Sequence, residues 1–318
     1  MPLIYRLLLA LLCSFVFQPA NAQEQVRVGV YVNDVPQFDL TTNSFTIDAV
    51  IWFRWSDPDY DPATTMEFMN PFEGWDGART PTFEQPEQLD DGSYYQTVRY
   101  QGQFASRMPL TLYPFDSQTL QVVMEDVHAN ADEQIYVPDA EPVVISPSLG
   151  LSDYVIKGAR LDVAEQTYAT GFGDTSLKGL ETYSRATLSI PLHRPSVTYG
   201  IKVLFPILVI LACAALALWL HPGHSEARVG LVVTSLLTLV AFQLTSLPQV
   251  NYIIMMDWMF FLSYLYVLGT LVQVVRSHWI IRSRDEDMAV GIDRQFFWVI
   301  SAGFIAMSVL VLVLSARA

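Results

Sequence analysis

Four long apolar stretches in the second half of the chain constrain its fold more than any other feature. They cover residues 201–220, 229–247, 252–275 and 296–314, and the charged residues inside them are Lys202 and Asp257. Each stretch has about the 20 residues that a helix needs to cross ~30 Å of hydrocarbon. We therefore expect four membrane helices, over residues 198–220, 226–247, 251–276 and 293–315, with a short cytoplasmic loop over residues 277–292.

The charge of the chain is concentrated ahead of these stretches. Residues 23–195 contain 26 acidic and 10 basic side chains, a net formal charge of −16, whereas residues 196–318 contain 6 acidic and 7 basic ones. This separation predicts an acidic soluble domain over residues 23–195 and a membrane domain over residues 196–318. It excludes a basic nucleic-acid-binding protein, a disordered acidic protein and a cytosolic enzyme with a single core.

Residues 1–22 have the features of a secretory signal peptide. Arg6 precedes an apolar run that ends at Phe17, and the small residues Ala20 and Ala22 follow at the spacing that signal peptidase accepts. A fifth membrane span is the alternative, but the run is too short to cross a bilayer. We expect the mature chain to start near Gln23 and the acidic domain to be exported.

Residues 23–195 alternate apolar and polar residues in short runs, which is typical of strands that bury one face. The runs cover residues 26–32, 45–53, 94–100, 119–124, 154–163 and 182–190, and turn-forming residues separate them. This spacing predicts an immunoglobulin-like β-sandwich, so the expected fold class is an α+β membrane protein. The two cysteines, Cys13 and Cys213, both lie outside this domain, so it contains no disulfide.

The loops indicate how the chain is oriented in the membrane. Arg276, Arg282, Arg284 and Arg294 surround the connection between the third and fourth expected helices, whereas residues 246–251 contain no base. Basic loops stay on the cytoplasmic side. We expect a multi-pass protein of the cell membrane with the N-terminal domain and the C-terminus outside, in the periplasm if the source is a Gram-negative bacterium.

The second expected helix carries an unusual stripe. At helical spacing its members are Glu226, Gly230, Thr234, Leu237, Ala241 and Leu244. Repeated around an axis, the stripe forms a water path, in which an acidic ring attracts cations and an apolar ring gates by dewetting. Alternatively, Glu226 lies in a solvated loop beside Arg228, and the hydroxyl groups of the helix bond to their own backbone. The stripe alone does not choose between the two interpretations.

Two segments resemble a known family. Residues 113–120, Tyr-Pro-Phe-Asp-Ser-Gln-Thr-Leu, resemble the signature of pentameric ligand-gated ion channels, the Cys-loop receptor superfamily. Residues 227–231 and 234–238 are similar to the pore helix of glycine-receptor-type channels. Ser106 and Leu120 stand where animal members have the two cysteines of the signature loop. The chain therefore looks like the prokaryotic members, which lack that disulfide.

The resemblance implies a homopentamer in a lipid bilayer, with the second helix lining a pore and ligands bound between outer domains. It places Leu237 at the central hydrophobic gate and Glu226 at the inner mouth, where cation-conducting members carry an acid. We therefore expect Glu226 to select cations, with monovalent cations as the permeant ions. Between Ala241 and Pro248 the chain is shorter than the family pattern.

The resemblance also implies which residues couple the two domains. Asp116 lies in the signature, Arg194 precedes the first helix and Asp39 ends the first strand. Pro248, which follows the second helix, is the residue of the membrane domain that would receive the strain from the outer domain. A partly desolvated arginine–carboxylate cluster at the junction transmits strain from one domain to the other. The alternative is a set of separate solvated charges, each worth under about 1 kcal/mol.

The family's ligand pockets are aromatic cages at subunit interfaces, and such cages suit amines through cation–π contact. The candidates that this resemblance implies are Trp75, His128, Tyr168, Phe172 and Tyr183. Each aromatic residue is equally explained as sandwich core. Protons are a second possible agonist, because a histidine such as His128 or His193 changes charge near neutral pH.

The expected function is therefore a ligand-gated cation channel that opens when an amine or a proton binds the outer domain. The alternative is a membrane-anchored periplasmic sensor that does not conduct, and a mere anchor would have no use for the stripe. The sequence shows no nucleophile motif, metal triad or phosphate loop. We accordingly expect no enzyme activity, no cofactor, no metal and no nucleic-acid partner.

Overall fold

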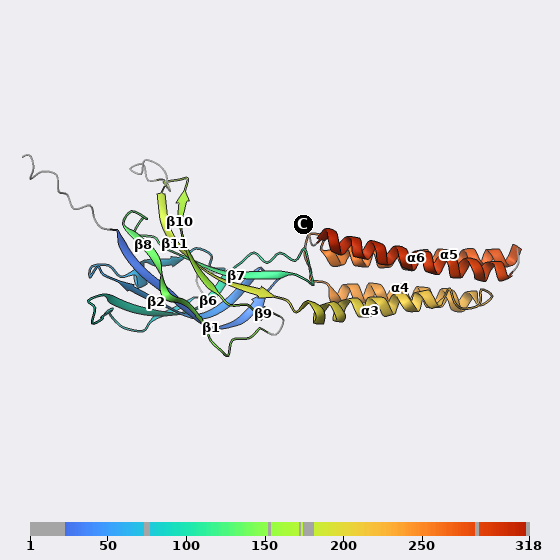
Figure 1. The fold of residues 1–318 in the computed structure, drawn as a ribbon, viewed down its shortest axis with the longest axis horizontal. Coiled ribbons are helices and arrows are strands. Elements are labelled where there is room, and N and C mark those ends of the chain that lie inside the picture. Colours follow the sequence, from blue (N-terminus) through green and yellow to red (C-terminus); the bar gives the residue numbers. More distant parts are fainter. Residues whose placement is uncertain are drawn as a thin grey trace, which may run out of the picture.

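The computed structural model describes residues 23–72, 77–151, 154–171, 173, 181–283 and 286–315. Residues 1–22, where we expect the signal peptide, lie outside this part. The chain forms a β-sheet domain followed by a bundle of four long helices, and the two lie end to end (Figure 1).

The strands of the β domain form two sheets. The strands of the first sheet are β1 (Glu24–Asp39), β2 (Ser44–Trp55), β4 (Ala78–Pro81), β5 (Glu87–Gln88), β6 (Tyr94–Ala105) and β8 (Gln134–Ile145). The strands of the second are β3 (Met66–Phe68), β7 (Ser117–Asp126), β9 (Val155–Ile156), β10 (Arg160–Tyr168) and β11 (Glu181–His193). Their orders are β4-β6-β2-β1-β8, with β5 beside β6, and β10-β11-β7-β3, with β9 beside β11. A short helix, α2 (Pro62–Thr65), connects β2 to β3.

Alternation along the strands accounts for the core of this domain. In β2 every second residue from Phe45 to Trp55 is buried, and in β1 the same holds from Val26 to Val32. These residues meet apolar side chains of β7 and β11 in one continuous cluster. The predicted β-sandwich is therefore confirmed, and the inner face of β2 holds Trp55 in the core.

Four long helices follow, namely α3 (Ser196–Leu216), α4 (Ser225–Ser246), α5 (Met255–Ser283) and α6 (Glu286–Ser315). Each is long and apolar enough to cross a membrane, which makes the chain a multi-pass membrane protein. Side chains of all four helices pack together in a second apolar cluster, separate from the sandwich core.

The expected loop over residues 277–292 differs from the structure. The helix α5 continues to Ser283 and α6 begins at Glu286, with residues 284–285 outside the described part. Charged residues end an apolar stretch but do not end a helix, because arginine and glutamate are good helix formers. Here Arg282 lies in the last turn of α5 and Glu286 in the first turn of α6, where each charge complements the helix dipole.

Candidate functional site

The stripe predicted on the second helix forms one exposed face of α4. All six residues are exposed in the subunit: Glu226, Gly230, Thr234, Leu237, Ala241 and Leu244. At about 100° per residue they lie on one side of the helix. The opposite side packs against the rest of the bundle through the buried residues Arg228, Val232, Ser235 and Leu239. Within the single subunit, Leu237 is 65% exposed and Leu244 is 78% exposed, so this face is free to line a shared space.

The order of residues along this face determines its chemistry. Glu226 lies in the first turn of α4, and Leu237 lies near the middle of the helix. Repeated around an axis, the carboxylates form a negative ring and the leucines form a constriction that water leaves when it is narrow. Two neighbouring hydroxyl groups, those of Ser235 and Thr238, donate to carbonyl oxygens one turn earlier, at 2.8 Å each. For these two residues the alternative interpretation, bonding to their own backbone, is confirmed.

A buried ion pair joins the signature loop to the segment that enters the first membrane helix. Nε of Arg194 donates to Oδ1 of Asp116 at 2.9 Å. Tyr154 and Gln118 donate to the other oxygen of Asp116, at 3.0 and 2.7 Å. The side chains of Arg194 and Asp116 are only 4% and 1% exposed. Water and salt therefore screen this pair much less than they would screen a surface pair.

Aromatic rings enclose the guanidinium group of Arg194. Its central carbon lies 5.1 Å from the ring centroid of Tyr113, 4.5 Å from that of Tyr154 and 4.7 Å from that of Tyr199. Burial alone would lower the pKa of Arg194, but the hydrogen bond to Asp116 and its charge outweigh burial and raise it. Burial, and then the charge of Asp116, raise the pKa of the Tyr154 phenol. The arginine is thus charged and the phenol protonated at neutral pH.

The loop between β6 and β7, residues 106–116, also touches the helical bundle. The backbone N–H of Leu110 donates to Oη of Tyr252 at 2.9 Å, and the N–H of Met255 donates to the carbonyl oxygen of Thr111 at 2.9 Å. Leu110 is 1% exposed and belongs to the apolar core of the helices. The β6–β7 loop therefore rests on the segment between α4 and α5, where Pro248 is half-buried.

Asp39 has a different environment from the other predicted coupling residues. Its carboxylate accepts hydrogen bonds from the backbone N–H groups of Thr41 and Thr42, at 2.7 and 3.4 Å. The first of these bonds is the main reason that the pKa of Asp39 is lowered. The structure thus brings Asp116 and Arg194 together, whereas Asp39 stabilises the turn after β1.

Two of the five ligand candidates, Tyr168 and Tyr183, lie together on the second sheet. Their rings pack edge to face with centroids 6.0 Å apart. Oη of Tyr168 donates to Glu125 at 2.9 Å, and Arg185 forms an ion pair with the same carboxylate. Burial, and then the hydrogen bond to Glu125, raise the pKa of Tyr168. Glu125 is thus paired with Arg185, and Arg185 also donates to the hydroxyl group of Tyr168.

The other three candidates are His128, Trp75 and Phe172. His128 is exposed in the turn after β7, and its backbone N–H donates to Asp126 at 2.8 Å. Trp75 and Phe172 lie outside the described residues, as do residues 174–180 of the connection between β10 and β11.

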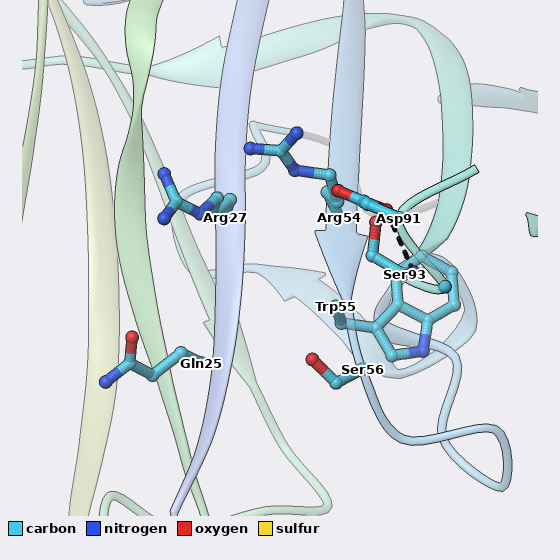
Figure 2. A pocket seen from close by; sticks show the side chains of 8 residues that line it. Gln25, Arg27, Arg54, Trp55, Ser56, Asp91 and Ser93 are labelled. Atoms are coloured by element: carbon cyan, nitrogen blue, oxygen red, sulfur yellow. Dashed lines mark hydrogen bonds between the residues drawn. The ribbon is translucent and has the colours of Figure 1, made fainter. Parts of the chain in front are cut away.

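A polar pocket of about 410 Å³ lies between the start of β1, the end of β2 and the turn before β6. Figure 2 shows Arg27 and Arg54 on neighbouring strands, with Asp91 next to Arg54. The two arginines are direct cross-strand partners, and Arg54 lies 3.8 Å from Asp139. The pocket thus combines two arginines with the carboxylate of Asp91, and Arg54 is already paired with Asp139. Among the described residues, no group of three or more His, Cys, Asp or Glu side chains is placed to hold a metal ion.

Several residues of the junction could not be identified from local sequence patterns. Tyr154 lies 38 positions after Asp116, and Tyr252 lies 142 positions after Leu110. Each contact depends on the packing of the whole chain. Gln118 was detectable in principle, because it lies inside the signature and two positions from Asp116, on the same side of an extended segment.

Comparisons with known proteins relate the chain to channel and receptor subunits. It is 22% identical over 272 residues to a proton-gated ion channel of Gloeobacter violaceus, a match that covers 80% of this chain and 73% of that protein. It is 22% identical over 272 residues to the glycine receptor subunit beta of Rattus norvegicus, a match that covers 78% of this chain and 53% of that protein. It is 24% identical over 186 residues to a gamma-aminobutyric acid receptor subunit beta-like protein of Drosophila melanogaster, a match that covers 58% of this chain and 36% of that protein.

The extent of these matches differs between the relatives. The chain spans about half of the rat protein's length and about a third of the fly protein's length, but most of the Gloeobacter protein. No family model matches the chain.

Proposed function

This chain is a homologue of the pentameric ligand-gated ion channels, the Cys-loop receptor superfamily, and we propose that it forms a cation-selective, ligand-gated channel. Five copies surround an axis, and the exposed face of α4 lines the pore between them. A ligand that binds the β-sandwich opens this pore through the buried junction between the two domains.

The exposed face of α4 is the observation that carries the proposal. Its six residues run from Glu226 to Leu244 on one side, while the buried residues of α4 lie on the other. A helix that contacts only lipid needs no carboxylate at its entrance, since a charge near hydrocarbon is unfavourable. A helix that faces water on a shared axis accommodates Glu226 readily, and Leu237 then supplies the hydrophobic gate.

Cation selectivity follows from the distribution of charge. Five Glu226 carboxylates at the inner mouth attract cations and repel anions. The outer domain adds a net formal charge of −16 per subunit over residues 23–195. This charge raises the local concentration of monovalent cations where they enter.

The proposed orientation places the β-sandwich and the C-terminus outside the membrane. It is supported by the basic residues at the junction of α5 and α6, including Arg276, Arg282 and Arg294, which favour the cytoplasmic side. The inner mouth at Glu226 then faces the cytoplasm, at the same end of the bundle as these arginines.

The trigger is either a small amine or a proton. The edge-to-face pair of Tyr168 and Tyr183 supports an amine, because two aromatic faces attract a cation. The Gloeobacter relative is a proton-gated channel, which supports the proton. The two triggers are separable, since an amine acts at constant pH and a proton acts without an organic ligand.

Recording currents from purified full-length protein in planar lipid bilayers tests the proposal. We expect currents to appear either on acidification of the outer side or on addition of small amines at neutral pH. If an amine is the trigger, Tyr183→Ala weakens the response to the amine and Tyr95→Ala, a tyrosine of the other sheet, leaves it unchanged. Protein that is folded and pentameric yet silent under every condition contradicts the channel and supports a non-conducting sensor.

A further inference from the structure

Arg228 is a charged residue of the pore helix that has no contact with solvent. It is 0% exposed, and it lies two residues from the exposed Glu226 at the start of α4. Since about 100° separates successive residues of a helix, the two side chains point to nearly opposite sides. One faces the proposed pore, and the other faces the interior of the subunit.

Asp293 of α6 is the counter-charge of Arg228. Nη2 of Arg228 donates to Oδ2 of Asp293 at 2.6 Å, and Asp293 is 1% exposed. Two buried side chains of α5 complete the carboxylate's shell: Nε2 of Gln273 donates to its Oδ1 at 2.7 Å and Oγ of Ser277 to its Oδ2 at 2.8 Å.

The guanidinium group of Arg228 is bound on other sides as well. Its Nε donates to the carbonyl oxygen of Ala217, just after α3, at 2.6 Å, and its Nη1 donates to Oγ of Ser277 at 3.3 Å. One side chain of α4 is thus hydrogen-bonded to groups from α5 and α6 and to the residue that follows α3. We call this set of five residues, Ala217, Arg228, Gln273, Ser277 and Asp293, the inner polar cluster.

The cluster fixes the inner end of α4 because both of its charges are buried and are paired with one another. A buried charge that loses its counter-charge is strongly unfavourable, so α4 cannot shift or rotate at Arg228 without breaking the pair. The outer half of α4 is held differently, by a half-buried hydrogen bond from Tyr264 to Gln243 and by apolar packing. Within the described part of the chain, the ion pair between Arg228 and Asp293 is the only ion pair that includes a residue of α4.

We propose that Asp293 is a positioning residue for ion selectivity: by holding Arg228, it fixes the radius of the Glu226 ring. The pair also withdraws a positive charge from the start of α4, where the side chain of Glu226 is exposed. This inference rests on the proposed function, because Glu226 must face a pore for its radius to affect ions. Asp293 itself touches no permeant ion and acts through Arg228.

The test removes the ion pair without leaving a lone buried charge. The double variant Arg228→Met/Asp293→Leu replaces both side chains by apolar ones, a kind of change that buried ion pairs often tolerate. A milder variant, Ser277→Ala, removes one hydroxyl group of the cluster. Ser263→Ala is its matched control, because Ser263 is an equally buried serine of α5 whose hydroxyl bonds to its own helix at Met259.

Two measurements are made on each full-length variant in lipid vesicles. The first is the distribution of distances between spin labels at position 224 of the different subunits. The labels are attached to His224→Cys in a Cys213→Ser background, and position 224 lies at the exposed start of α4. The second is the reversal potential of the current in a KCl gradient. We expect the double variant to broaden the distances and to move the reversal potential towards zero, Ser277→Ala to do both more weakly, and Ser263→Ala to do neither.

The distance measurement needs no current, so it separates this inference from the proposed function. A protein that carries no current contradicts the proposed channel function. The distances between its spin labels still decide whether the inner polar cluster positions α4. A pentameric double variant with unchanged distances and an unchanged reversal potential overturns the inference. If the double variant does not form pentamers, Ser277→Ala decides in its place, and distances equal to those of Ser263→Ala overturn the inference.

Discussion

Replacing Asp116 by asparagine tests the buried junction directly. The substitution keeps the shape of the side chain but leaves the Arg194 guanidinium, 4% exposed, without its counter-charge. Removing one partner of a buried ion pair costs about 3–5 kcal/mol. Because about 1.4 kcal/mol corresponds to a tenfold change in an equilibrium, local opening at the junction should become more frequent by about a hundredfold or more.

Hydrogen exchange measured by mass spectrometry on the full-length protein in lipid nanodiscs reads out this opening. The informative amides lie where Ser117 of β7 pairs with His193 of β11, next to the ion pair. The matched control is Asp162→Asn, which breaks an exposed pair with Arg160 at 2.7 Å, with side chains 59% and 72% exposed. An exposed pair is worth about 1 kcal/mol or less, so the control should change exchange by less than about tenfold. Equal effects of the two substitutions would refute a buried, energetically significant junction.

Two further predictions concern the gate and the acid stability of the sandwich. Leu237→Ala should ease opening, because it widens and wets the apolar constriction, and an activation curve identical to that of the unmodified channel contradicts this. A hydrogen bond from Arg99, at 2.7 Å, lowers the pKa of Asp48 to about 2. The ionised Asp48 carboxylate therefore stabilises the fold fully above about pH 4, and this stabilisation is lost as the pH falls towards 2. Asp48→Asn should therefore lower the thermal midpoint of the full-length protein at neutral pH but much less near pH 2, and a pH-independent difference would contradict the linkage.

Hydropathy was sufficient to locate the membrane helices but not their ends. The apolar stretches match α3 to α6, since each must supply about 30 Å of hydrophobic length. The third helix was expected to end at residue 276 and the fourth to begin at residue 293, whereas α5 ends at Ser283 and α6 begins at Glu286. The difference arises because Arg282 and Glu286 remain helical beyond the apolar region. A helix boundary depends on capping and packing, which hydropathy does not describe.

Period-two alternation identified most long strands of the sandwich but missed β8. This strand contains Pro138 and Pro142, which argue against a central strand in any sequence-based prediction. In the structure β8 is an edge strand that pairs in parallel with β1, and its register shifts after Pro138, where Val28 is the partner. The prolines are tolerated because an edge strand has one side without ladder partners.

The candidate site shows the same division between local and long-range information. The face of α4 could be predicted because all its residues lie on one helix and follow its period. The partner of Arg228 could not, because Asp293 lies 65 positions later, on another helix. Beside Glu226 in the sequence, Arg228 suggests a solvated pair of charges, whereas in the structure it is completely buried.

The reversal potential in a KCl gradient, compared between the unmodified channel and Glu226→Gln, tests the central proposal most directly. We expect the unmodified channel to reverse near the potassium equilibrium potential and Glu226→Gln to reverse closer to zero. The matched control is Glu286→Gln, which removes an exposed carboxylate at the same end of the bundle but from α6. It should leave the reversal potential unchanged. An unchanged cation preference in Glu226→Gln would contradict a pore lined by α4 with Glu226 as its selectivity ring.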